Sequence, residues 1–303
     1  MFRMPRPVTF LCAAALTVAL CLLSMSAAHA GPLRERLSAR RGDAAPTEAG
    51  LPAGSRVLRD QPYGPDPAQR MDVFVPPGVR GAPVIFMVHG GGWRRGDKAH
   101  GRVVGNKVAH WLPAGAILVS VNYRMLPEAD VPTQRDDVAA ALTKAQSLAA
   151  SWGGDPSRFV LMGHSAGAHL VALLAAAPPA GVQPWRAAVL LDSGALDVPR
   201  LMTERHAPLF DRAFGTDPAF WAATSPRHRL SGPTPPWLAV CSSRRSQACD
   251  QVDAFAQRVR DTGGRIELLP LDLSHGDINS TLGEPGHYTA RVDAFLRETG
   301  AVP

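Results

Sequence analysis

The sequence has 303 residues, of which 46% are hydrophobic and 19% charged, so it can bury the core of one globular domain or at most two. Its formal net charge is +6 at pH 7. The basic residues are scattered and no aromatic residues interleave with them, which argues against a nucleic-acid-binding protein.

The first 30 residues have the pattern of a cleaved signal peptide. Arg3 and Arg6 precede an apolar run over 8–23, and a small-x-small site ends at Ala30. The run is short for a membrane span, although a retained N-terminal anchor is the alternative. We therefore expect a periplasmic or secreted protein without a membrane anchor after cleavage. Residues 31–53 are polar and are interpreted as a flexible leader.

Strands and helices are expected to alternate over a single domain at 54–303. Two short strands come first, at 56–59 and 71–75, and are expected to form an antiparallel edge. Near-continuous apolar strands are then predicted at 84–88, 117–121, 159–162, 187–191, 237–240 and 265–269. Helices are predicted between or after them, at 103–112, 134–151, 166–176, 251–261 and 288–297. This order is typical of a doubly wound, mostly parallel α/β sheet, whose sites lie at the carboxyl ends of the strands.

One segment, 197–235, interrupts the alternation. It is long and rich in proline, and it contains four aromatic residues between 210 and 221. We interpret it as a short cap inserted between two strands that shapes a substrate pocket. The alternative is a surface excursion whose aromatic side chains dock on the core.

The motif Gly163-His-Ser-Ala-Gly167 follows a predicted strand and opens a predicted helix. In this setting a Gly-x-Ser-x-Gly sequence is a nucleophile elbow, a strained turn that exposes the serine hydroxyl at the top of a sheet. Ser165 is therefore the candidate nucleophile.

A second glycine motif, His89-Gly-Gly-Gly92, follows the strand at 84–88. Glycines let backbone N–H groups approach a ligand closely and point at one spot. Such a loop supplies oxyanion-hole donors, together with the N–H that follows the nucleophile. The candidate donors are the amides of Gly91, Gly92 and Ala166.

These motifs, with Asn122-Tyr-Arg124 and Ser274-His-Gly276, resemble those of the α/β-hydrolase fold. The chain is similar to the esterase/lipase group related to hormone-sensitive lipase and to kynurenine formamidase-like enzymes. The resemblance covers residues 57–296, nearly all of the mature chain.

A serine nucleophile needs a base, and His275 stands where this fold places its histidine. The identity of the triad's acidic residue stays open, because no carboxylate directly follows the strand at 237–240. Asp192 ends the preceding strand, whereas Asp250 would be drawn near the usual position if Cys249 were bonded to Cys241. In a third interpretation no acid is present, and a backbone carbonyl holds His275.

Cys241 and Cys249 are the two cysteines that remain after signal cleavage. An even pair in an exported chain predicts a disulfide between them.

The sequence thus predicts an exported serine hydrolase that cleaves small-molecule carboxylic esters through a Ser-His-Asp triad and an acyl-enzyme. Two alternatives are an amide or formamide hydrolase, as in the formamidase relatives, and a catalytically inactive binding module. No metal or cofactor is implied. Oligomeric state and natural substrate are not indicated.

Overall fold

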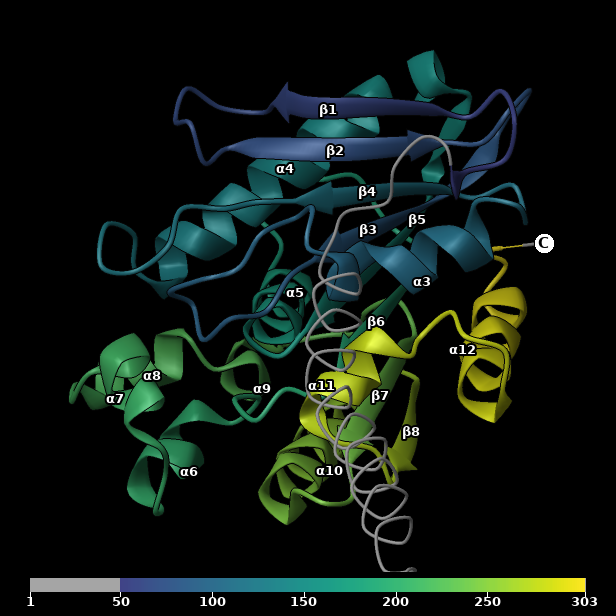
Figure 1. The fold of residues 1–303 in the computed structure, drawn as a ribbon. Coiled ribbons are helices and arrows are strands. Elements are labelled where there is room, and N and C mark those ends of the chain that lie inside the picture. The colour runs from purple at the N-terminus through teal and green to yellow at the C-terminus, as the bar shows by residue number, and fades with distance from the viewer. Residues whose placement is uncertain (1–49, 303) are drawn as a thin grey trace, which may run out of the picture. The chain divides into compact units, whose positions relative to one another are not determined.

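The computed structural model describes residues 50–302, so the predicted signal peptide and residues 31–49 of the predicted leader lie outside the described residues. An eight-stranded sheet has the order β1-β2-β4-β3-β5-β6-β7-β8 (Figure 1). Its strands are β1 (Arg56–Pro62), β2 (Arg70–Val75), β3 (Ala82–Val88), β4 (Ile117–Val121), β5 (Gly154–His164), β6 (Ala187–Leu191), β7 (Trp237–Ser242) and β8 (Ile266–Leu271). The pairs β1–β2 and β2–β4 are antiparallel and all other pairs are parallel, as the sequence predicted.

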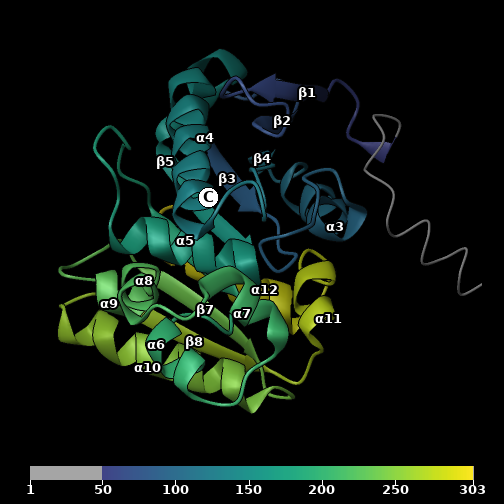
Figure 2. The same ribbon diagram turned by 90° about the vertical axis from the view of Figure 1, so that its left-hand side faces the viewer.

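Helices cover both faces of this sheet (Figure 2). They are α3 (Gly101–Trp111), α4 (Val131–Trp152), α5 (Ala166–Ala176), α6 (Val198–Thr203), α7 (Pro208–Phe214), α8 (Pro218–Ala223), α9 (Pro226–Arg229), α10 (Ser246–Asp261), α11 (His275–Ser280) and α12 (His287–Glu298). No helix within residues 50–302 is long and apolar enough to cross a membrane.

The strands are apolar on both sides because each face has its own core. Along β3, Val84, Phe86 and Val88 belong to one core cluster with residues of α4, α5 and α10, whereas Ile85 and Met87 belong to a second cluster with residues of α3 and α12. Because side chains alternate across a strand, burial on both faces requires a continuous apolar run. This is the doubly wound α/β-hydrolase fold that the sequence predicted.

The segment between β6 and β7 holds four short helices, α6 to α9, which lie together beyond the carboxyl end of the sheet (Figure 1). Phe214 is buried against Trp93, with ring centroids 5.0 Å apart. His169 of α5 donates from Nε2 to the carbonyl of Thr224 over 2.8 Å. The segment is thereby attached to the loop after β3 and to the helix after the predicted elbow.

Helix α10 begins at Ser246 rather than at Gln251, the expected start. Asp250 is therefore inside the helix. The N-cap is Arg245, whose side chain makes no capping bond.

The predicted disulfide is present between Cys241 at the end of β7 and Cys249 on α10. It closes the loop over 242–248, which joins the sheet to the start of the helix. The Cys249 sulfur also lies 3.5 Å from the Ser242 carbonyl oxygen. The covalent link fixes this loop against the carboxyl edge of the sheet.

Replacing both cysteines by serine should lower the free energy of unfolding by about 2–3 kcal/mol, because the open loop regains conformational freedom in the unfolded state. Urea unfolding of the double variant and of the parent chain measures the difference. The parent chain with reductant is the control and should approach the variant. Equal unfolding midpoints for all three samples would contradict the prediction.

Candidate active site

The register of the parallel strands brings several loops to one edge of the sheet. Val88 pairs with Gly163, and His164 pairs with Leu191, which in turn pairs with Val240. The residues that follow β3, β5, β6 and β7 therefore leave the sheet side by side. Ser165 and Asp192, the residues directly after β5 and β6, are neighbours for this reason.

Ser165 occupies a sharp turn between β5 and α5, with φ 55° and ψ −120°. Such a conformation is strained for a residue with a side chain and needs support from its surroundings. The Ser165 amide donates to the Leu191 carbonyl over 2.9 Å. A Cβ at Gly163 would lie 2.4 Å from the Gly167 carbonyl oxygen, so only glycine fits there. The motif thus builds the elbow that it predicts.

His275 connects Ser165 to a carboxylate. Its Nε2 lies 3.0 Å from Ser165 Oγ, and its Nδ1 lies 2.6 Å from Asp192 Oδ2. An ionised carboxylate only accepts hydrogen bonds, so the contact with Asp192 requires the proton on Nδ1. Arg245 Nη1 also lies 2.7 Å from Nδ1, but a guanidinium only donates, so its hydrogen bond goes to Asp192. Nε2 then has the lone pair and accepts from the Ser165 hydroxyl. This is the tautomer that a general base requires.

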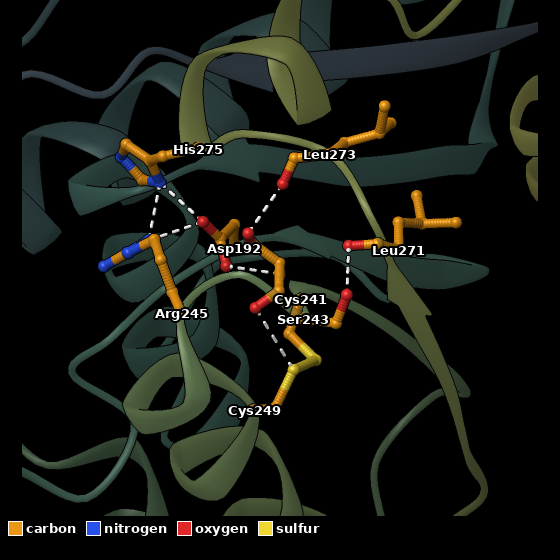
Figure 3. Close-up of a disulfide and its surroundings, with 9 residues drawn as sticks. Asp192, Cys241, Ser243, Arg245, Cys249, Leu271, Leu273 and His275 are labelled. Atoms are coloured by element: carbon orange, nitrogen blue, oxygen red, sulfur yellow. Dashed lines mark hydrogen bonds and ion pairs between the residues drawn. A yellow bond between two sulfur atoms is a disulfide. The ribbon is translucent and has the colours of Figure 1, made fainter.

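The Asp192 side chain is fully buried and has three donors around it. Besides His275, the Ser242 amide donates to Oδ1 over 2.9 Å, and Arg245 Nη1 lies 2.5 Å from Oδ2. Figure 3 shows Arg245 and His275 converging on this carboxylate. Burial alone would raise the pKa of Asp192, but the hydrogen bonds from His275 and Ser242 and the charge of Arg245 hold it below its usual value. The carboxylate therefore stays ionised.

The alternative acid, Asp250, is exposed on α10. The disulfide does not carry it to His275. Instead, the loop that the disulfide closes supplies the Ser242 amide and Arg245, two of the three groups that contact Asp192. Of the two candidate carboxylates, the structure brings Asp192 to the imidazole.

The glycine loop after β3 faces Ser165 across a cleft of about 800 Å³ that Gly91, Gly92 and Ala166 help to line. Among residues 50–302, the amides of Gly91 and Gly92 donate to no protein acceptor. Ala166 is the first residue of α5, where an amide has no partner within the helix. Gly91 has φ 127°, and a Cβ there would meet the Arg95 carbonyl, so this loop also requires glycine. All three amides are available to an oxygen atom in the cleft.

The side chain of His89 is fully buried and supports this loop. Its Nδ1 lies 2.8 Å from the Gly90 carbonyl, and its ring stacks on Tyr123 at 4.6 Å. The Tyr123 hydroxyl donates to the His89 carbonyl over 3.0 Å. Burial lowers the pKa of His89, so the ring is neutral and acts as a structural support.

Two other histidines lie near the elbow and are held neutral. His164 donates from Nε2 to the His275 carbonyl over 2.9 Å, and burial followed by the nearby His275 lowers its pKa to about 3. His169 accepts at Nδ1 from Trp93, and burial lowers its pKa to about 4. Both rings therefore position neighbouring segments.

Lys107 of α3 was not singled out by the sequence, yet it anchors the segment that carries His275. It is fully buried, and its Nζ donates to the carbonyl and the side-chain oxygen of Asn279 over 2.6 and 3.0 Å. Asn106 donates to the next carbonyl, that of Ser280, over 2.6 Å. Together these residues hold the C-terminal end of α11, whose first residue is His275. Burial lowers the pKa of Lys107 to about 7.

Within residues 50–302 there is no group of three or more His, Cys, Asp or Glu side chains arranged to hold a metal ion.

Comparison with known proteins agrees with this architecture. A family model described as BD-FAE matches residues 71–180. Carboxylesterase NlhH of Mycobacterium tuberculosis is 39% identical over 149 residues, which are 46% of this chain and 45% of that protein. A probable isoprenylcysteine alpha-carbonyl methylesterase of Oryza sativa subsp. japonica is 34% identical over 119 residues, 39% of this chain and 27% of that protein. The matched regions thus span less than half the length of these two relatives.

Solved structures share the fold over most of the chain. Esterase B from Lactobacillus rhamnosis has a TM-score of 0.68 at 21% identity, covering 93% of this chain and 96% of that one. The chain therefore has the α/β-hydrolase fold. Parts of it are similar to a carboxylesterase and a methylesterase, in line with the resemblance that the sequence motifs indicated.

The buried side chain of Lys107 predicts that the stability of the protein depends on pH. Between about pH 7 and about pH 10 the unfolded chain binds a proton at Lys107 that the folded chain does not, so the parent's stability gains a contribution that rises with pH. A Lys107→Met variant lacks this contribution. The unfolding free energy of the parent minus that of the variant should therefore increase from about pH 7.5 to about pH 9.5.

Denaturant unfolding at the two pH values measures this difference. Lys144→Met, at an exposed position of α4, is the matched control and should show a smaller change. A parent-minus-variant difference for Lys107 that stays constant or falls with pH would refute the assignment.

Proposed function

We propose that this protein is an exported serine hydrolase that cleaves carboxylic esters of small molecules. The observation that carries the proposal is the hydrogen-bonded line from Ser165 through His275 to the buried carboxylate of Asp192. It supports an enzyme over an inactive binding module, because a module has no need for a strained serine aligned with a correctly protonated imidazole. The esterase names of the relatives support the choice of an ester bond.

In the proposed mechanism, Ser165 Oγ attacks the ester carbonyl carbon while His275 Nε2 takes the hydroxyl proton. The carbonyl oxygen becomes negatively charged and accepts hydrogen bonds from the amides of Gly91, Gly92 and Ala166. Asp192 keeps His275 in the required tautomer and stabilises the imidazolium. The tetrahedral intermediate collapses, the leaving alcohol takes the proton from His275, and Ser165 is left acylated.

The second half repeats the chemistry with water. His275 removes a proton from a water molecule, the resulting hydroxide attacks the acyl carbonyl, and the same amides hold the oxyanion. Collapse releases the carboxylic acid and returns the proton to Ser165.

Export is proposed from the signal-peptide pattern of residues 1–30 and is supported by the disulfide, since such bonds persist in oxidising compartments. The expected location is the periplasm or the exterior of the cell.

Replacing Ser165 by alanine should abolish turnover of short p-nitrophenyl esters, with a loss on the order of 10⁶ in kcat, because no other group supplies the nucleophile. The parent chain should also react with a fluorophosphonate probe, whereas the variant should not. Circular dichroism and the unfolding midpoint control for the fold. Undiminished turnover by the variant would refute the mechanism, and a parent that hydrolyses N-formyl anilides but no ester would favour the amide alternative.

The identity of the acid is tested by a pair of isosteric variants. Asp192→Asn should lower kcat by about 10⁴, because the amide can accept or donate and no longer enforces the Nδ1–H tautomer. Asp250→Asn removes an exposed carboxylate near the same loop and should leave kcat within about threefold of the parent. The reverse pattern would assign the acid to Asp250, and near-normal turnover in both variants would leave a Ser-His dyad.

A further inference from the structure

The cleft in front of Ser165 is lined by four arginines and by no carboxylate. Arg94, Arg95, Arg212 and Arg245 all contribute to its walls, whereas Asp192 is buried beneath them. An excess of one charge sign around a cleft concentrates ligands of the opposite sign. The positive charge of the lining therefore indicates which kind of substrate the cleft binds.

The four arginines differ in whether their charge is balanced. Arg245 is paired with Asp192. By contrast, no carboxylate among residues 50–302 lies within ion-pair distance of Arg94, Arg95 or Arg212, and their side chains donate to no protein acceptor there. Three guanidinium groups at the cleft thus have no internal counter-charge.

These three arginines come from two separate segments, the turn after the glycine loop and helix α7. Arg94 and Arg95 follow the glycine loop, and their amides donate to the Gly91 carbonyl over 3.4 and 3.2 Å. The turn fixes their backbone next to the proposed oxyanion donors. Arg212 comes from α7 of the inserted segment, next to Phe214, which is buried against Trp93. The positive lining is thus anchored to two ordered parts of the site.

The remainder of the cleft wall is apolar or aromatic. Trp93, Leu209 and Phe210 line it, and the rings of Trp93 and Phe210 lie 5.9 Å apart. A ligand that fits this lining has a hydrocarbon or aromatic body and an anionic group. Guanidinium groups suit oxygen anions in particular, because their planar arrangement of donors matches a carboxylate.

We infer that the substrate is a negatively charged ester, in which an anionic oxygen group on the acyl or alcohol part is recognised by Arg94, Arg95 and Arg212. This inference rests on the proposed ester hydrolysis and specifies its substrate class. The anion stays outside the reacting bond, so it contributes to binding and orientation while Ser165 and His275 perform the chemistry.

The test uses ester pairs that differ only in charge. 4-Acetoxybenzoate and 4-acetoxybenzamide place the carboxylate or its neutral isostere on the alcohol part. Methyl hydrogen glutarate and methyl glutaramate place them on the acyl part. Each kcat/KM is divided by the alkaline hydrolysis rate of the same ester, to remove differences in intrinsic reactivity.

In at least one pair, the corrected kcat/KM of the anionic ester should exceed that of the neutral ester by about tenfold at low ionic strength. The preference should shrink when salt is raised to about 0.5 M, because salt screens exposed charges. Equal or better turnover of the neutral partner in both pairs would overturn the inference while leaving ester hydrolysis intact.

Variants assign the preference to the cleft. Arg212→Gln and Arg94→Gln should each reduce the ratio of anionic to neutral kcat/KM by about threefold or more. Arg229→Gln removes the same charge from an exposed position of α9 outside the cleft and should preserve the ratio. Because both esters are measured on one variant, a general loss of activity cancels. A ratio that falls equally in Arg229→Gln would overturn the assignment to the cleft.

Binding of the reaction products separates the two proposals. Calorimetry with the parent chain should show tighter binding of 4-hydroxybenzoate than of 4-hydroxybenzamide if the anionic group is recognised on the alcohol part. It should show tighter binding of glutarate than of glutaramate if the anionic group is recognised on the acyl part. Such a preference without turnover of any ester would refute the esterase proposal and retain the anion site. Absence of a preference in both pairs, with turnover or without, would overturn the anion site.

Discussion

The site depends on keeping a charged carboxylate stable at the edge of a buried sheet. The Asp192 side chain has no solvent contact, and an isolated charge in such a place costs several kcal/mol. Three donors compensate for the lost water: His275, the Ser242 amide and Arg245. They come from two different segments, the first residue of α11 and the loop over 242–248 that joins β7 to α10. The carboxylate is therefore stabilised only when this part of the sheet is fully assembled.

The same requirement explains why the sequence predicts some parts of the site and leaves others open. Ser165 and its flanking glycines are contiguous, and their turn is determined by local sterics, so the motif alone identifies them. The strands are predicted because burial on both faces demands continuous apolar runs. The partner of His275, in contrast, lies 83 residues earlier in the chain. Which carboxylate reaches the imidazole depends on strand register, and a single sequence does not specify that register.

Two residues that support the site left no usable signal in the sequence. Arg245 stands in a polar run that looks like an ordinary surface loop, and the helix was expected to start only at Gln251. The disulfide, at a sequence separation of 8, joins the end of β7 to a helix that has already begun. Lys107 is one of two Lys or Arg residues of α3, the other being Arg102, and only the packing of α3 against α11 reveals that its amino group is buried.

The disulfide and the charge distribution of the cleft are linked through one short loop. Residues 242–248 carry both Ser242 and Arg245, so the covalent closure of this loop limits the motion of two donors to Asp192 (Figure 3). Arg245 is therefore paired with the buried Asp192 carboxylate, which neutralises its charge. Arg94, Arg95 and Arg212 have no such partner within the described residues, and they lie on other segments, the turn after the glycine loop and α7. The structure thus separates the positive charge that maintains the proposed triad from the positive charge that faces the open cleft.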